Sequence, residues 1–131
     1  MTIQSILAVG AGGALGAIAR YAVYIVAGRL LGPEFPYGTL IVNVVGSFLM
    51  GIIIDVMALT WEASLEWRLF LVVGCLGAFT TFSTFSLDFA TLYGRGRLDL
   101  CALYVSASVI LSVGALFLAM FATRSILIPK T

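Results

Sequence analysis

Apolar residues fill four long stretches of this chain, and short segments between them contain the Trp residues and most of the charged ones. The four stretches cover approximately residues 3–27, 37–59, 69–92 and 98–122. A helix of about 20 apolar residues is long enough to cross the hydrocarbon core of a bilayer. The pattern therefore predicts an all-α membrane protein, with a single four-helix transmembrane domain over residues 1–131.

Composition supports a chain that lies almost wholly in the lipid bilayer. Of its 131 residues, 62% are hydrophobic and 10% are charged, whereas soluble domains are about half apolar and roughly a quarter charged. Four spans leave no room for a soluble nucleotide-binding module. The chain has no His and a net charge of +1, which argues against a transition-metal site and against a nucleic-acid partner.

The basic residues divide evenly between the two faces of the predicted bundle. One face collects both termini and the second loop, with Arg68, Arg124 and Lys130; the other collects loops one and three, with Arg29, Arg95 and Arg97. Because an excess of Lys and Arg normally sets orientation, two interpretations stay open. Either one borderline charge or the N-terminal amine decides, or both orientations are made and form an antiparallel, dual-topology homodimer. Four short spans enclose a pathway poorly, which favours a dimer.

Polar residues recur at helical spacing inside the second and fourth stretches. Thr39 and Asn43 share one face of the second, and Tyr104, Ser108 and Ser112 form a stripe along the fourth. Polar groups at this depth are expensive and are therefore candidates for function. Each set could line a wet ion path or form hydrogen bonds between helices, and a Ser can also bond its own helix.

The third stretch contains a predicted break. Gly74 and Gly77 precede the adjacent Thr80 and Thr81, a combination with low helix propensity and with side chains that compete for backbone hydrogen bonds. A break near residues 77–80 would free carbonyl oxygens, which suit a hard cation such as Na⁺. The alternative is that the glycines only allow close helix packing.

Two phenylalanines follow the predicted break. Phe82 and Phe85 lie on one helix face, and the positive edge of a phenyl ring attracts an anion weakly. A conducted ion must be able to leave its site, so weak attraction suits a pore. Such a pair taken alone is usually core packing.

The remaining charged residues of the spans suggest no catalysis. Arg20 either snorkels to the interface or lines an anion-concentrating vestibule. Asp55 and Asp88 lie near span ends, where we expect capping or interfacial pairing. Since no nucleophile-and-base arrangement is present, the chain is not predicted to be an enzyme.

Three segments carry a resemblance to a known family. They are Gly12–Tyr21 (GGALGAIARY), Gly38–Gly46 (GTLIVNVVG) and Gly74–Ser86 (GCLGAFTTFSTFS). Together they resemble the bacterial CrcB/Fluc fluoride channels, and the resemblance covers all four predicted spans.

The resemblance implies an antiparallel dual-topology homodimer in the bacterial inner membrane, whose pores pass fluoride out of the cytoplasm and reject chloride. It implies that Asn43 donates a hydrogen bond to fluoride and that Phe82 and Phe85 present their ring edges to the ion. It places Arg20 at a vestibule. The expected polar lining comprises Thr39, Ser83, Thr84, Tyr104, Ser108 and Ser112. The carbonyls of Gly77 and Thr80 would hold a structural Na⁺ at the dimer centre.

Two other functions compete with a fluoride channel. A proton-coupled exporter resembling the small multidrug resistance family would need a titratable acid deep in the bundle, and the first span has none. A non-conducting membrane scaffold would use every polar residue for packing, but this does not explain why they gather at similar depths.

Overall fold

The computed structural model describes residues 1–128, and the chain is helical almost throughout. The elements in chain order are α1 (Ile3–Leu31), α2 (Tyr37–Leu59), α3 (Leu65–Arg68), the π-helix η1 (Leu69–Leu76), α4 (Gly77–Phe79), α5 (Phe82–Gly94) and α6 (Leu98–Leu127). Elements α3 to α5 together form one span. Four stretches, including this composite one, are long and apolar enough to cross a membrane. The predicted all-α architecture with four spans is confirmed.

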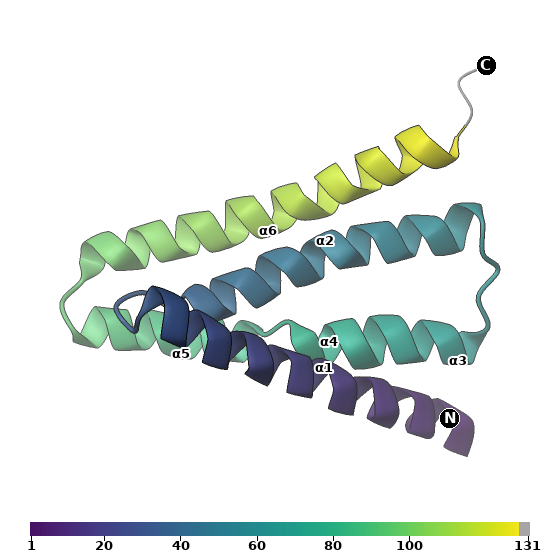
Figure 1. Cartoon of the computed structure of the whole chain (residues 1–131), viewed down its shortest axis with the longest axis horizontal. Coiled ribbons are helices and arrows are strands. Elements are labelled where there is room, and N and C mark those ends of the chain that lie inside the picture. Colours follow the sequence, from purple (N-terminus) through teal and green to yellow (C-terminus); the bar gives the residue numbers. More distant parts are fainter. Residues whose placement is uncertain (129–131) are drawn as a thin grey trace.

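The spans form two pairs that lie side by side (Figure 1). α2 packs along α6, and both run in the same direction, away from the end that holds loops one and three. α1 packs against the composite third span. The N-terminus and the end of α6 at Leu127 lie at the opposite end of the molecule (Figure 1), in agreement with the loop assignment used in the charge count. Lys130, one charge in that count, lies outside the described residues.

Glycines bring α1 and η1 into backbone contact. A Cβ on Gly16 would collide with the carbonyl oxygen of Cys75, and one on Gly12 with that of Phe70. Gly74 faces α1 from the other side, close to the Cα of Gly12. Small residues that let backbones approach are the usual means of helix association in lipid. Close packing therefore explains these three glycines.

Three helix ends lie several residues outside the approximate bounds of the predicted spans. α1 continues past the expected residue 27 to Leu31, because Gly28 is tolerated within the helix and the positive φ of Gly32 (77°) provides the stop. The third span begins at Leu65 and α6 ends at Leu127. Arg20 consequently lies about three turns from the C-terminal end of α1.

After the short α3, the third span continues as a π-helix, which the sequence did not predict. In η1 the hydrogen bonds reach from residue i to i+5, as from the N–H of Gly77 to the carbonyl of Val72. π-Helical turns are rare and commonly occur at functional sites. This one ends at Leu76 and is separated from the interruption of the span only by the short helix α4.

Candidate functional site

The third span is interrupted at two residues. Thr80 (φ −83°, ψ 162°) and Thr81 (φ −158°, ψ 122°) have extended backbone between α4 and α5. α5 continues roughly along the line of α4, so the span is bent only slightly (Figure 1). The predicted break is therefore present, but Gly77 is still helical and the extended residues begin at Thr80.

Asn43 on α2 holds the break open through both ends of its amide. Its Oδ1 accepts from the backbone N–H of Thr81 (2.8 Å), and its Nδ2 donates to the carbonyl of Thr81 (3.0 Å). In a continuous helix that N–H would bond the carbonyl of Gly77. The pairing with Asn43 therefore releases the Gly77 carbonyl from the helical ladder.

The Thr80 carbonyl is released in a similar way. Its helical donor would be the N–H of Thr84, which instead donates to Oγ1 of Thr81 (3.2 Å), the N-cap of α5. The freed carbonyl accepts from Nη1 of Arg20 at 3.3 Å. Arg20 thus contacts the break and does not snorkel to the interface. Its vestibule role stays a prediction.

An open groove of about 330 Å³ lies between α2, the break, α5 and α6. It brings together five of the predicted pore residues from three spans: Asn43, Phe82, Phe85, Ser108 and Ser112. Within the described part of the chain, no charged residue lines it; the remaining lining is Gly46, Ser47, Met50, Thr80, Thr81, Val109 and Leu116. The groove is therefore a neutral, partly polar channel along the bundle.

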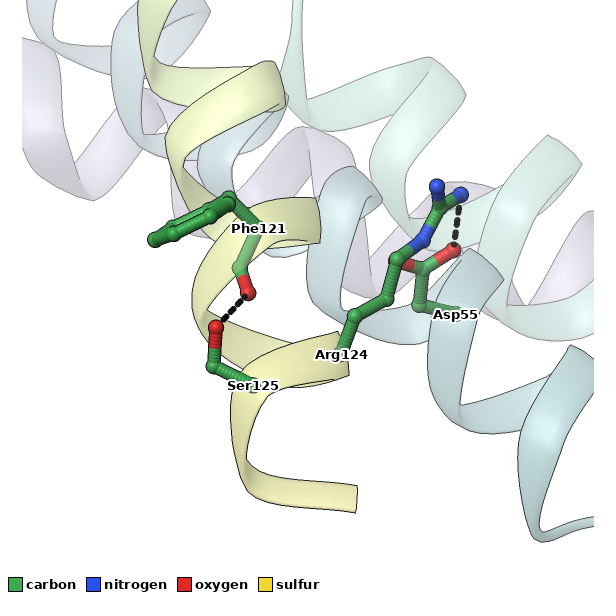
Figure 2. Close-up of polar contacts among 4 residues, drawn as sticks. All are labelled: Asp55, Phe121, Arg124 and Ser125. Atoms are coloured by element: carbon green, nitrogen blue, oxygen red, sulfur yellow. Dashed lines mark hydrogen bonds and ion pairs between the residues drawn. The ribbon is translucent and has the colours of Figure 1, made fainter. Parts of the chain in front are cut away.

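Two hydroxyls in this groove have no hydrogen-bond partner among residues 1–128. The Oγ atoms of Ser108 and Ser112 are buried and unpaired. Ser125, farther along the same helix, shows the usual alternative, because its Oγ donates to the carbonyl of Phe121 at 2.8 Å (Figure 2). The hypothesis that Ser108 and Ser112 bond their own helix is therefore wrong, and neither hydroxyl has a partner among the described residues.

The two phenylalanines have different surroundings. Their ring centroids are 5.4 Å apart, with the planes tilted by 41°. Phe85 is partly buried and packs against Tyr104, at 5.0 Å between centroids. Phe82 is 78% exposed and lines the groove. Core packing therefore explains part of the role of Phe85 and none of that of Phe82 in this chain.

Other predicted pore residues lie outside the groove. Thr39 and Thr84 line a second pocket of about 370 Å³ at the end that holds loops one and three. Tyr104 is fully buried, and Ser83 is exposed, with its hydroxyl 3.2 Å from that of Thr81. The structure therefore divides the predicted pore set into a groove, a second pocket and two residues that line neither.

Asp88 is the organising residue of the second pocket. Its Oδ2 accepts from the hydroxyls of Thr39 (2.6 Å) and Tyr104 (2.9 Å), on α2 and α6 respectively. We expected a helix cap or an ion pair for this carboxyl, and the structure shows neither within residues 1–128. No local spacing could have revealed the cluster, because its three members come from three spans. By contrast, Asp55 forms the expected ion pair, with Arg124 at 2.7 Å (Figure 2).

A comparison with known protein families shows to which family the chain belongs. Residues 7–120 match the family described as CrcB-like protein, Camphor Resistance (CrcB). The chain belongs to this family. Since the match contains the groove, the break and the second pocket, all three features lie in the part that the family shares.

Similar proteins are named fluoride-specific ion channels. The Agrobacterium fabrum protein of that name is 49% identical over 122 residues, which are 93% of this chain and 98% of the relative. The Rhodospirillum centenum protein is 50% identical over 94% of this chain and 98% of its own length. The Nitrobacter winogradskyi protein is 56% identical over 85% of this chain and 88% of its own length.

Proposed function

We propose that this member of the CrcB-like family is a passive channel for fluoride. The observation that carries the proposal is the groove in which Asn43, two phenyl rings and the unpaired hydroxyls of Ser108 and Ser112 meet. A dehydrated small anion needs hydrogen-bond donors, and the groove offers them without a fixed charge that would trap the ion. The names of the relatives support fluoride as that anion.

Asn43 can hydrogen-bond the backbone at the break and donate to an anion at the same time. One N–H of its Nδ2 is used by the Thr81 carbonyl, and an amide nitrogen carries two hydrogens. The second N–H remains as a donor for an ion in the groove. The ring edges of Phe82 and Phe85 add a weak positive potential beside it.

We propose an antiparallel, dual-topology homodimer as the working unit. Support comes from the open side of the groove, from the 78% exposure of Phe82 and from the balanced basic residues at the two ends. A second copy would cover the groove and complete its wall. A tag on one terminus should be found on both sides of the membrane, and detection on one side alone would contradict dual topology.

The carbonyls of Gly77 and Thr80 are the proposed ligands of a structural Na⁺ at the dimer centre. Both are released from helical hydrogen bonds at the break, and carbonyl oxygens are suitable ligands for a hard cation. A second subunit would double the set to four oxygens. Arg20 donates one hydrogen bond to the Thr80 carbonyl oxygen. The second lone pair of that oxygen remains for the cation. When bound, the cation would link the two chains.

The sodium proposal has a test that does not depend on ion flux. Protein purified in sodium buffer and in N-methylglucamine buffer of equal ionic strength is compared by size exclusion in detergent. We expect the dimer to dissociate more readily without Na⁺. Equal dimer stability in the two buffers would remove the sodium site from the proposal.

The physiological role that we propose is export across the bacterial inner membrane. Hydrogen fluoride is neutral, crosses membranes and ionises in a less acidic cytoplasm, where the anion is trapped. The inside-negative membrane potential then drives the anion out through a passive pore, at about 2.3 kcal/mol per charge and 100 mV. No coupling to ATP is required.

Reconstitution tests the channel directly. Purified protein in KF-loaded liposomes, with valinomycin to carry K⁺, should release fluoride to an ion-selective electrode and leave chloride inside in a matched KCl sample. Absence of fluoride-selective release would refute the proposal. Because Asp88 is a carboxylate within the bundle, the assay is repeated with an imposed proton gradient, and a strict requirement for that gradient would favour a coupled transporter.

A further inference from the structure

Polar residues on α2 and α6 form two stripes with the same spacing. On α2, Thr39 and Asn43 are followed one turn later by Ser47. On α6 the corresponding stripe is Tyr104, Ser108 and Ser112. Residues four apart lie on one helix face, and successive members of each stripe are about 6 Å apart along the axis. Ser47 is the member that the sequence patterns did not single out.

The two helices run side by side in the same direction (Figure 1). Two contacts show which residues of the two stripes lie at the same level along the bundle. Thr39 and Tyr104 share Oδ2 of Asp88, at 2.6 and 2.9 Å. Farther along, a Cβ on Gly51 would lie 2.5 Å from the carbonyl oxygen of Leu116. The difference in residue number between the α6 member and the α2 member is the same for Thr39 and Tyr104 as for Gly51 and Leu116. The same offset places Ser47 at the level of Ser112.

Ser47 lines the same groove as the two unpaired serines of α6. It is half-buried, and within residues 1–128 its hydroxyl has no hydrogen bond to the protein. Most hydroxyls elsewhere in the spans do bond the protein, as Ser86 and Thr91 do with carbonyls of their own helix. The groove therefore contains unused donors on two facing helices.

We propose that Ser47 is a further anion-contacting residue, which with Ser112 forms a hydroxyl site one turn beyond Asn43. The inference rests on the proposed fluoride channel and extends it toward the end of the bundle at which α2 and α6 end. An anion that leaves Asn43 moves about 6 Å to reach this pair. Beyond it the lining becomes apolar, at Met50 and Leu116, so the two hydroxyls are the last donors of the groove.

The test is fluoride efflux from liposomes by Ser47→Ala and Ser47→Thr. A hydrogen bond to a charged group contributes about 1.5–3 kcal/mol, so loss of the hydroxyl should slow efflux roughly tenfold or more. Ser47→Thr retains a hydroxyl and should recover most of the rate. Ser106→Ala is the matched control, because Ser106 is exposed on α6 and outside the groove.

Three outcomes separate this inference from the function on which it depends. If Ser47→Ala conducts like the parent while Ser112→Ala is slow, the role of Ser47 is refuted and the channel stands. If the parent protein shows no fluoride-selective efflux, the channel proposal itself fails. A slow Ser47→Ala variant whose thermal midpoint and dimer fraction match the parent supports the inference, because a purely structural hydroxyl would change stability as well.

Discussion

Replacing Asn43 by Ala should first of all destabilise the extended backbone at the break. The substitution removes the side-chain partners of both backbone groups of Thr81, the N–H at 2.8 Å and the carbonyl at 3.0 Å. Thr81 is only 7% exposed. Its backbone groups would therefore lose their hydrogen bonds in a place that water reaches poorly.

The expected cost follows from these two contacts. Leaving a buried donor or acceptor unsatisfied costs about 1–3 kcal/mol, so the pair gives roughly 2–6 kcal/mol. The open groove beside Asn43 admits water, which compensates in part and favours the lower end of that range. We expect a loss of about 2–3 kcal/mol in stability, together with a loss of fluoride conduction, since the donor to the anion is removed as well.

Asn43→Asp separates the two effects. The carboxylate still accepts from the N–H of Thr81, although it can no longer donate to the Thr81 carbonyl. It also places negative charge beside the proposed anion path. At about 4 Å and an effective dielectric constant near 20, the repulsion between two unit charges is about 4 kcal/mol, which corresponds to roughly a thousandfold slower passage.

Thermal unfolding in detergent and liposome efflux measure the two effects. Ser86→Ala is the control, because its hydroxyl only bonds the carbonyl of Phe82 in its own helix. A thermal midpoint of Asn43→Ala equal to that of Ser86→Ala would refute the role of Asn43 in holding the break. Undiminished fluoride efflux by Asn43→Asp would refute its place beside the anion.

Other substitutions test the rings, the glycine contact and the ion pair. Phe82→Ile should lower fluoride efflux and leave the chain folded, because the ring is exposed to the groove; unchanged efflux would remove the ring-edge role. Gly16→Ala should destabilise by about 1–3 kcal/mol in thermal unfolding, whereas Gly10→Ala should not, since nothing lies within 4 Å of its added Cβ; equal midpoints would contradict the close contact. Arg124→Gln should cost more stability than Asp55→Asn, because the carboxylate is 3% exposed and the guanidinium 53%, and breaking a pair costs most when a buried charge is left alone; the opposite order would refute this.

The sequence predicts the fold well because the bilayer imposes simple rules. Apolar length located all four spans, and the weak helix formers around Thr80 located the interruption to within a few residues. The exact position could not be predicted, since the N–H of Thr81 is captured by Asn43, which is 38 residues away. The helical ends of α1 and α6 were missed because helix stops in this chain depend on single residues such as Gly32.

The candidate site was predicted less completely, for a geometric reason. Spacing along one helix shows which residues share a face, but it does not show which face meets which. Asn43 and Ser108 were selected from different helices, and only packing of α2 on α6 brings both to one groove. Tyr104 was placed in the same stripe as Ser108, but its hydroxyl donates a hydrogen bond to Asp88 outside the groove. Asp88 was expected to cap a helix or form an ion pair, whereas its hydroxyl partners, Thr39 and Tyr104, come from other spans. Ser47 was not singled out, because the groove that it lines is formed by several spans.

The π-helix η1 has a consequence for the direction in which α5 presents its side chains. A π-helical turn takes up more residues than an α-helical one, so residues 69–76 rotate everything after them about the axis of the span. A helical wheel drawn at 3.6 residues per turn from Trp67 therefore loses its phase within Leu69–Leu76, before it reaches Phe82 and Phe85. The side that α5 presents to the groove is thus influenced by the winding of a segment, Leu69–Leu76, that does not itself line the groove.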